Sequence, residues 1–461
     1  MRTDKAEHGP LYGALRRHAL TEPHRNAVIH DAGVPTYGEL LHEVDVRAEL
    51  ISQQGSFWHI LHDPPKVEFM LDYLATTKAN TPVVISDGTT TAGSIASLLR
   101  ENTEAVDSLV VAAPEVIFTS GSSAKAKAVL LDGHQMYRKA LQINDFMGNS
   151  PEDVELITLP LRHSFGLGRL RCAVARGQTT RLVERIGSPD ELFELTKPHA
   201  ANGLAFIGSM AKILLSRHEG ALAESAGRIS YVEIGSEPLE LEFRQALVRL
   251  LPDARLGMHY GMTELSRVAM VDLRQSTTGP AAAGQPMPEV EVRITDPSGA
   301  VEHTGRPGEI WVRGAAMLRA YVHEDGLRTV PRQTWLQTKD HGHVREDGAL
   351  VVEGRLSTVL NILGKKVVPE ETERVLRGLF PRLDCVCVPA ELIPGVLILV
   401  AVLESPDTDR PDRAVLHSSL SERLPAHQIP RRFVYADRLP RLANGKVDRA
   451  CAIDIASGRE L

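Results

Sequence analysis

The sequence predicts an α/β protein with a large N-terminal domain of layered α/β subdomains plus a β region, followed by a small mobile α+β C-terminal domain. Short β-branched runs alternate with helical stretches along most of the chain, closely spaced strands follow, and a strand–helix pattern begins after Arg355. The 461 residues also exceed what one hydrophobic core supports. We therefore expect two domains, formed by residues 1–353 and 354–461.

The large domain is predicted from the rhythm of its strands and helices. Residues 116–118, 155–159 and 231–234 are β-branched runs of strand length, and residues 239–251 have helical periodicity. Alternation of this kind indicates parallel α/β layers.

Two later segments complete the predicted architecture. Between about residues 290 and 352, the runs VEVRI, GEIWVRG and GALVVEG are separated by Gly, Pro and Asp turns, which predicts an antiparallel β region. The run VLNILGKKVVPEETERVL then predicts a strand and a helix that begins near Pro369, with Glu370 and Glu371 in its first turn.

Charge and composition exclude some classes of partner. The net charge of -7 gives no electrostatic reason to expect nucleic acid or an anionic membrane. The N-terminus is polar, and the longest apolar run, residues 395–403, is too short to cross a bilayer, so we expect a cytoplasmic protein. The four cysteines include Cys385 and Cys387 in the strand-like run DCVCVP, which predicts buried reduced thiols because zinc spacing is missing.

One loop has the chemistry of a phosphate site. The run VIFTSGSSAKAKAVLL places a strand before hydroxyl, glycine and lysine residues that can hold phosphate oxygens. It is not a close Walker A match, because no Gly precedes Lys127 and Ala128 follows it. Taken alone, a solvated polar turn is the alternative. The loop residues are Thr119, Ser120, Gly121, Ser122, Ser123, Lys125 and Lys127.

Further motifs recur in a fixed order along nearly the whole chain. PTYGEL and YLATTKANTPVV come before the loop, and LPLRHSFG, IGSEPL and HYGMTE come after it. GEIWVRG, TKD, VEGRLSTVLNILGKKVVPEE and LPRLANGKVDR then follow. In this order the motifs resemble those of the adenylate-forming superfamily, which includes acyl-CoA synthetases, peptide-synthetase adenylation domains and luciferases.

The resemblance implies a ligase that joins a carboxylic acid, through an acyl-AMP, to the thiol of CoA. ATP, AMP, Mg²⁺ and CoA would bind, residues 1–353 would form the AMP-binding and acyl-binding domain, and residues 354–461 would move. Both transition states gather negative charge that needs positioned donors. By this resemblance Thr263 contacts the α-phosphate, Glu264 holds Mg²⁺, and Lys446 meets the acyl and phosphate oxygens.

The resemblance also assigns the groups around the nucleoside and the acyl chain. Tyr260 offers a flat face for adenine, Asp340 accepts from both ribose hydroxyls, and Arg355 adds a cation. His163 would lie near the acyl carbonyl, with a structural histidine as the alternative, and Gly364 would leave room for pantetheine, with a plain turn glycine as the alternative. Gly235, Ser236, Glu237, Pro238, His259, Gly261 and Met262 complete the predicted nucleotide and acyl site.

Several departures from the family pattern concern adenylation. Ala124, Ala126 and Ala128 stand where Gly, Pro and Gly are usual, and each added Cβ should weaken pyrophosphate binding. Lys339 replaces the Gly of Thr-Gly-Asp, and Ser357 stands where a hinge Asp or Lys is common. One hypothesis is that thioesterification survives while adenylation from ATP is impaired or lost. Lys446, which only adenylation needs, argues for the opposite, and both versions stay open.

Two other classes of function also stay open. The chain could load a carrier protein instead of CoA, or it could be a degenerate nucleotide-binding protein without activity. Three arginines of the gate segment could recognise a second polar group on the acid or bind surface carboxylates. Arg431-Arg432 or Lys365-Lys366 could meet CoA phosphates or be solvated, and His341-Gly-His343 is expected to be a polar β turn. The three arginines are Arg162, Arg169 and Arg171.

Overall fold

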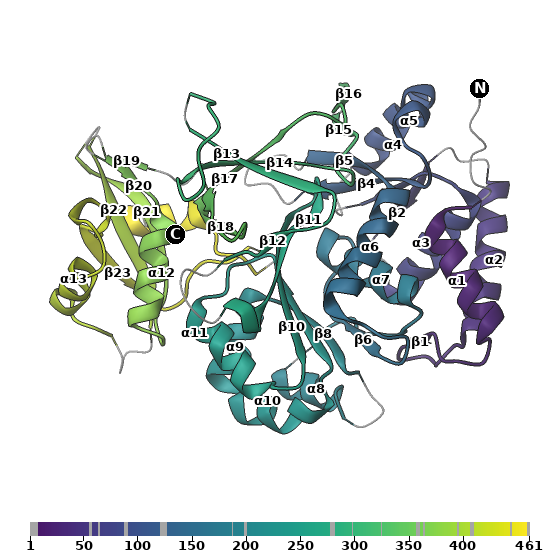
Figure 1. The fold of residues 1–461 in the computed structure, drawn as a ribbon, viewed down its shortest axis with the longest axis horizontal. Helices are drawn as coiled ribbons and strands as arrows, with labels where there is room; N and C mark the ends of the chain where they lie inside the picture. Colours follow the sequence, from purple (N-terminus) through teal and green to yellow (C-terminus); the bar gives the residue numbers. More distant parts are fainter. Residues whose placement is uncertain are drawn as a thin grey trace.

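The chain folds into a large lobe that ends with strand β18 and a small lobe that follows it (Figure 1). The computed structural model describes residues 8–54, 58–62, 65–86, 91–119, 127–186, 188–197, 201–276, 282–296, 298–323, 325–355, 360–362, 365–393, 396–405, 410–442 and 445–458. The predicted mixed α/β fold is confirmed.

The largest sheet contains the strands whose carboxyl ends form the candidate site described below. It has eight strands in the order β1-β7-β6-β8-β9-β10-β11-β12. The strands from β1 to β10 in this order are parallel, and β11 and β12 are antiparallel to their neighbours. Their bounds are Val28–Ile29 (β1), Val154–Ile157 (β6), Thr179–Leu182 (β7), Gly203–Ile207 (β8), Tyr231–Gly235 (β9), Arg255–Met262 (β10), Ser266–Asp272 (β11) and Gln285–Pro286 (β12).

Helices cover both faces of this sheet. Because side chains alternate along a strand, Tyr231 of β9 packs in one apolar cluster with α6 and α7, whereas Val232 and Ile234 pack in another cluster with α9 and α11. The helices of the first group are Pro10–Thr21 (α1), Gly133–Met147 (α6) and Ser164–Arg176 (α7). Those of the second are Pro189–Glu194 (α8), Gly208–Arg217 (α9), Glu219–Ser225 (α10) and Leu241–Leu250 (α11).

A six-stranded sheet in the order β16-β15-β5-β4-β3-β2 lies beside the first sheet. Its strands are His59–Leu61 (β2), Val83–Ile85 (β3), Pro114–Thr119 (β4), Lys127–Asp132 (β5), Ala320–His323 (β15) and Gly326–Thr329 (β16). The nearby helices are Tyr37–Gln53 (α2), Lys66–Ala79 (α3), Thr91–Glu101 (α4) and Thr103–Leu109 (α5). Helix α2 begins with a capping box, in which the side chains of Thr36 and Glu39 bond reciprocally to backbone N–H groups.

The predicted antiparallel β region is present as a four-stranded sheet in the order β13-β14-β17-β18. The strands are Val290–Thr295 (β13), Gly308–Gly314 (β14), Leu336–Val344 (β17) and Leu350–Arg355 (β18). Strands β15 and β16 come from the same stretch of sequence but belong to the six-stranded sheet, where β15 pairs with β5 and β16 pairs with β15. Strand β18 runs past the predicted boundary between residues 353 and 354, and that boundary stays a prediction.

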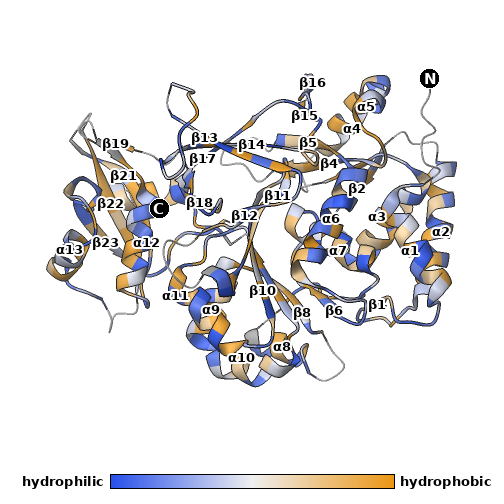
Figure 2. Ribbon diagram, in the orientation of Figure 1, coloured by the Kyte–Doolittle hydropathy of each residue, from blue (hydrophilic) through white to orange (hydrophobic). Residues whose placement is uncertain are grey.

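The small lobe is α+β. A hairpin of Leu360–Ile362 (β19) and Lys365–Val367 (β20) precedes a three-stranded sheet of Asp384–Ile393 (β21), Val396–Glu404 (β22) and Arg432–Ala436 (β23). Helices Pro369–Leu379 (α12), Arg413–Ser421 (α13) and Arg449–Ser457 (α14) pack on it. Figure 2 shows that β21 and β22 are strongly apolar. Cys385 and Cys387 are buried free thiols in β21, as predicted, and burial raises the pKa of Cys385 to about 12.

Within the described ranges, no helix has the length and apolar character required to span a membrane.

Candidate active site

The site is built where parallel strands end. Because β8, β9 and β10 are parallel, their carboxyl ends meet at one edge of the eight-stranded sheet, where α/β folds place ligands. Strand β9 ends at Gly235, and Ser236 follows it in the left-handed region, with a φ of 68°. Strand β10 carries His259 to Met262, with an irregular register at Tyr260 and Gly261, and Thr263 and Glu264 follow in a turn.

The turn after β9 is held close to the start of α9, which follows β8 directly. The backbone N–H of Ser209 donates to Oε2 of Glu237 at 2.7 Å. A Cβ on Gly208 would lie 2.9 Å from the carbonyl oxygen of Pro238, so this crossing requires glycine. The predicted segment from Gly235 to Pro238 therefore lies directly beside the start of α9.

Asp340 contacts two other predicted nucleotide-binding residues, Arg355 and Tyr260. Antiparallel pairing of β17 and β18 places it opposite Arg355, whose Nε lies 3.0 Å from Oδ1 of Asp340. The hydroxyl of Tyr260 donates to Oδ2 of the same carboxylate. Burial raises the pKa of Asp340, although Arg355, Tyr260 and Lys446 oppose this shift. The structure thus brings together Tyr260, Asp340 and Arg355, of which the first and last are 95 positions apart in the sequence.

Lys446 reaches this cluster from the small lobe. It lies in the loop before α14, where backbone hydrogen bonds join Leu442 to Lys446 and Gly445 to Leu442 at 2.8 and 2.9 Å. Burial and the charge of Arg355 lower the pKa of Lys446, whereas Glu237 and Asp340 oppose this shift. The ammonium group is therefore within electrostatic reach of Glu237, which follows β9, and of Asp340 in β17.

A second cluster surrounds Glu264. Pairing of β4 with β5 places Thr119 opposite Lys127, and the Nζ of Lys127 lies 5.8 Å from the ring centre of Tyr321. The hydroxyl of Tyr321 forms a weak hydrogen bond, 3.5 Å long, to Oε1 of Glu264. Burial raises the pKa of Glu264, and Lys127 opposes the shift. Sequence reasoning missed Tyr321, because no local pattern shows that β15 pairs with β5 beside the site.

The phosphate loop itself is only partly described. Ser120, Gly121, Ser122 and Ser123 lie outside the described residues, as does Gly364. Ala128 is a buried member of β5 in the core of the six-stranded sheet, so its Cβ packs there. The expectation that this Cβ weakens phosphate binding stays a prediction, as it does for Ala124 and Ala126, which lie outside the described residues.

His163 precedes α7 as its N-terminal flanking residue and is half-buried. Two positions further along the helix, Phe165 packs edge-on against the ring of His259, with ring centres 4.7 Å apart. The predicted gate segment and the predicted strand end therefore meet between α7 and β10.

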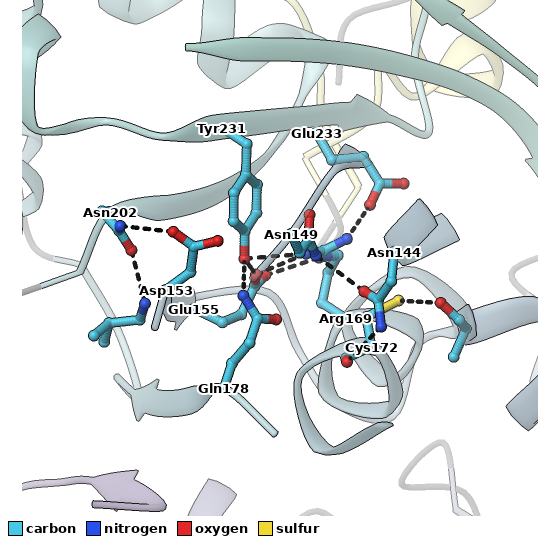
Figure 3. Close-up of polar contacts among 12 residues, drawn as sticks. Asn144, Asn149, Asp153, Glu155, Arg169, Cys172, Gln178, Asn202, Tyr231 and Glu233 are labelled. Atoms are coloured by element: carbon cyan, nitrogen blue, oxygen red, sulfur yellow. Dashed lines mark hydrogen bonds and ion pairs between the residues drawn. The ribbon is translucent and has the colours of Figure 1, made fainter. Parts of the chain in front are cut away.

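The arginines of α7 have a different role from the one expected. Arg169 is fully buried, and its guanidinium group bonds Glu155 at 2.8 and 2.7 Å and Glu233 at 2.6 Å (Figure 3). Arg171 is buried beside Glu115 at 2.7 Å and Tyr73. Because these partners are themselves buried in strands or helices, both expectations, a polar group of the acid or surface carboxylates, are wrong for Arg169 and Arg171. Arg162 is half-buried, and its role stays a prediction.

His341 and His343 are not in a turn. They lie on β17, and their Nδ1 atoms contact the two carboxylate oxygens of Glu353 on β18 at 3.0 and 2.8 Å. Although burial raises the pKa of Glu353, these two contacts lower it below its ordinary value. The expectation of a polar β turn is therefore wrong.

The residues proposed for CoA phosphates are partly engaged elsewhere. Arg432 donates to the carbonyl oxygen of Ala456, whereas Arg431 is exposed on the small lobe. The side chains of Lys365 and Lys366 lie outside the described residues.

The donor set suits a hard cation bound together with phosphates. Among the described residues, no group of three or more His, Cys, Asp or Glu side chains is placed to hold a metal ion. Mg²⁺ commonly takes only one or two carboxylates and completes its shell with phosphate oxygens and water. The half-buried carboxylate of Glu264, beside the end of the phosphate loop, fits that mode of binding.

Comparisons with known proteins show what this chain is similar to. Residues 112–322 match the family described as AMP-binding enzyme. The 4-coumarate–CoA ligase-like 6 of Oryza sativa subsp. japonica is 26% identical over 309 residues, which are 65% of this chain and 50% of that protein. The chain thus spans about half the length of this relative. The 2-succinylbenzoate–CoA ligase of Bacillus licheniformis is 28% identical over 346 residues, 73% of this chain and 69% of that protein.

Among solved structures, ATP-bound MatB from Rhodopseudomonas palustris has the same fold, with a TM-score of 0.80 and 20% sequence identity. The alignment covers 97% of this chain and 98% of that one. The whole described architecture, including the small lobe, therefore has a counterpart of known structure.

Proposed function

The chain belongs to the adenylate-forming superfamily, and from this premise we propose that it is an acid–thiol ligase that makes an acyl-CoA thioester through an acyl-AMP. The observation that carries the proposal is the meeting of Tyr260, Asp340 and Arg355 with Lys446 of the small lobe. The names of the relatives, CoA ligases of aromatic acids, support CoA as the thiol.

Asp340 has the capacity to bind the ribose. A carboxylate offers about four lone-pair sites, and Tyr260 and Arg355 each approach a different oxygen of Asp340. Acceptor sites therefore remain on both oxygens for two ribose hydroxyls. Tyr260, held by its hydroxyl, would then present its ring to the adenine, as the family resemblance implies.

In adenylation, a carboxylate oxygen of the acid attacks the α-phosphorus of ATP. The new P–O bond forms as the bond to the β-phosphate bridging oxygen breaks, and pyrophosphate leaves. Negative charge on the non-bridging oxygens needs cations and donors that are already in place. Lys446, Thr263 and Lys127 would supply them, and a Mg²⁺ ion on Glu264 would neutralise charge on the phosphates.

In thioesterification, the sulfur of CoA attacks the acyl carbon of the acyl-AMP. A C–S bond forms, the bond from the acyl carbon to the phosphate oxygen breaks, AMP leaves, and the thiol proton passes to solvent. The site would hold the AMP through Asp340 and Arg355 in both half-reactions. The role of Gly364 beside pantetheine stays a prediction.

We further propose that adenylation is the slower half-reaction. Ala124 and Ala126 stand in the phosphate loop where the family has Gly and Pro, and added Cβ atoms restrict backbone approach to phosphate. The electrostatic reach of Lys446 to Asp340 supports an adenylation that is slowed rather than lost.

The test compares two routes to the same product. Purified protein receives acid, ATP, Mg²⁺ and CoA in one reaction, and synthetic acyl-AMP and CoA in the other. We expect acyl-CoA from both, formed faster from acyl-AMP. Equal rates would refute slow adenylation, and product from neither route would refute the ligase proposal. Replacing CoA with a phosphopantetheinylated carrier protein tests the thiol acceptor.

A further inference from the structure

Lys66 buries its ammonium group where two parallel strands of the eight-stranded sheet end. The residue is the first of α3 and is 6% exposed. Its Nζ donates to the carbonyl oxygens of Ile157 at 3.2 Å and Thr158 at 2.9 Å, and to that of Val183. A buried charge is costly unless hydrogen bonds compensate it, and a cation at the start of a helix meets an unfavourable dipole. We call these three carbonyl oxygens the carbonyl cage, because they stabilise the ammonium group in this place.

The ammonium group joins β6 and β7 where the pairing of the two strands ends. Their register ends at Ile157 and Leu182, and the N–H of Val183 donates to the carbonyl oxygen of Ile157 at 3.3 Å. One residue past each strand, Nζ of Lys66 bridges the carbonyl oxygens of Thr158 and Val183. The side chain therefore takes the place of a further contact between the strands.

Strand β6 has less support from its other neighbour, β8. Among the described residues, β6 is in register with β8 at a single pair, Glu155 and Gly203, whereas β8 is in register with β9 from Gly203 to Ile207. Within this part of the chain, the carboxyl end of β6 is thus in register with β7 alone, and Lys66 lies directly beyond it. The direction in which the chain leaves β6 therefore depends on the carbonyl cage.

The chain that leaves β6 is the predicted gate segment, residues 159–166. The N–H of His163 donates to the carbonyl oxygen of Pro160 at 3.3 Å, and a Cβ on Gly166 would lie 2.3 Å from the same oxygen. The turn is therefore packed too closely to bend within itself without a clash. A displacement of Thr158 should move the gate segment as a unit.

The far end of the gate segment borders the candidate site. Phe165 packs edge-on against the ring of His259, and the next residue along β10, Tyr260, contacts Asp340. Asp340 and its partner Arg355 lie in a different sheet, on β17 and β18. A movement that starts at the carbonyl cage should therefore change the side of the site formed by the gate segment more than the side formed by Asp340 and Arg355.

We propose that Lys66 is a positioning residue, whose ammonium group in the carbonyl cage fixes the gate segment where the acyl group of the acyl-AMP binds. The inference rests on the proposed function, because an acyl-adenylate brings an acyl group to this segment. Without the ammonium group, three carbonyl oxygens face one another with no cation between them, so the strand ends should separate. The acyl group should then add less to binding, while the contribution of AMP stays.

The experiment measures the two contributions with stable mimics of the acyl-AMP, so that it does not depend on turnover. Titration calorimetry compares AMP with three N-acylsulfamoyl adenosines, which carry acetyl, benzoyl and 4-coumaroyl groups. We expect the parent protein to bind at least one mimic more tightly than AMP. Lys66→Met, which keeps a long side chain but not its charge, should bind AMP as the parent does and the preferred mimic about tenfold more weakly.

Rescue tests the ammonium group itself. Lys66→Ala removes the side chain beyond Cβ, and propylammonium supplies the atoms removed. Propylammonium should restore the affinity of Lys66→Ala for the mimic, whereas tetramethylammonium, a cation without N–H donors, should not. Lys66→Arg, which keeps a cation with donors, should lose less affinity than Lys66→Met. Lys78→Met, in the last turn of the same helix, removes an ion pair with Asp45 and is the matched control, which should bind both ligands as the parent does.

Hydrogen exchange followed by mass spectrometry observes the gate segment without a ligand. In Lys66→Met, the amides of residues 161–167 should exchange about tenfold faster than in the parent protein, because their anchor is weakened. The amides of β9 and β10 should keep their parent rates. Propylammonium should slow the exchange of residues 161–167 in Lys66→Ala, and thermal unfolding of each variant checks that it is folded.

The outcomes separate the inference from the proposed function. If Lys66→Met binds AMP and the mimic as the parent does and its gate segment exchanges at the parent rate, the inference is overturned while the ligase proposal stands. If AMP and the mimic lose equal affinity, or if the variants at position 66 unfold, Lys66 supports the large lobe as a whole and the inference is likewise overturned. If the parent protein binds no mimic more tightly than AMP, the proposed function fails, and the inference fails with it.

Discussion

At the scale of single residues, the candidate site depends on the contacts that the Asp340 carboxylate makes with its two neighbours. Its two oxygens already contact Tyr260 and Arg355, and its side chain is buried. The free protein therefore already holds together the three residues that we propose to bind the nucleoside. Binding AMP should then cost little rearrangement, which favours affinity.

Asp340→Asn should weaken AMP binding by about ten- to a hundredfold, because hydrogen bonds to a charged acceptor contribute about 1.5–3 kcal/mol. Titration calorimetry with AMP measures the change. Glu346→Gln, on the exposed turn that joins β17 to β18, is the matched control and should bind AMP normally. An unchanged affinity in Asp340→Asn would show that the ribose binds elsewhere.

Lys446 should give adenylation an alkaline limit. Because burial and Arg355 lower its pKa, the ammonium loses its proton at a lower pH than an ordinary lysine. Adenylation, measured as pyrophosphate release, should therefore decline as the pH rises through this lowered pKa, while thioesterification of acyl-AMP does not follow the same profile. Lys446→Arg keeps the charge at every accessible pH, so any residual adenylation in it should lack this decline. The same decline in both proteins would exclude Lys446 as its cause.

The sequence alone identified most of the residues that meet in the site, but not their contacts. Tyr260, Asp340, Arg355 and Lys446 were found through motifs, and the family resemblance implied that they meet around one nucleotide, but the contacts between their side chains were not visible in the chain. Tyr321 could not be found, because its place beside Glu264 depends on the pairing of β15 with β5 across nearly 200 residues. The functional roles of all these residues stay predictions.

At the scale of elements, sequence periodicity predicted where strands and helices lie better than it predicted what their side chains contact. The strands at residues 116–118 and 231–234 and the helix at Pro369 are present, because their patterns are local. The turn expected at His341-Gly-His343 is instead part of β17, since one face of the four-stranded sheet tolerates polar side chains. No local signal could show that Arg169 of α7 pairs with Glu155 and Glu233 of two separate strands.

That buried network should dominate the stability of the large lobe. Glu233 contacts Arg169, Arg267 and His259 without exposure to solvent. Glu233→Gln would leave two buried guanidinium groups short of their counter-charge and should cost about 3–5 kcal/mol of unfolding free energy. Urea unfolding measures the loss. Glu194→Gln, in an exposed pair with Lys197, is the control and should cost less than about 1 kcal/mol.

The network also gives stability a defined pH dependence. Because the pKa of folded Glu233 lies well below the ordinary value, its contribution is present above the unfolded pKa and is lost as the pH falls through the folded one. The parent protein should therefore lose more stability on acidification than Glu233→Gln does. Parallel acid dependence in the two proteins would show that Glu233 does not control it.

At the scale of the whole molecule, a series of ion pairs joins the two lobes, in addition to the approach of Lys446 to the large lobe. Arg377 of α12 lies 3.7 Å from Glu240, which precedes α11 in the large lobe, and Glu240 lies 2.7 Å from Lys212 of α9. Arg377 also contacts Asp384 at 3.1 Å within its own lobe. The observed arrangement, with Lys446 within electrostatic reach of Asp340, is therefore favoured by a partly buried ion pair between the lobes.

Glu240→Gln should selectively slow the step that uses this arrangement. Removing the charge weakens the contact with Arg377 but leaves the partners of Arg377 within the small lobe, so each lobe should stay folded. We expect kcat/KM for adenylation to fall about two- to fivefold, the range for a pair worth less than about 1 kcal/mol. Thioesterification of synthetic acyl-AMP should be unchanged or faster, if residues 354–461 move between the half-reactions as the family resemblance implies. Glu219→Gln, exposed on α10, is the control. Equal slowing of both half-reactions would mean that Glu240 supports the site itself and not the position of the lobes.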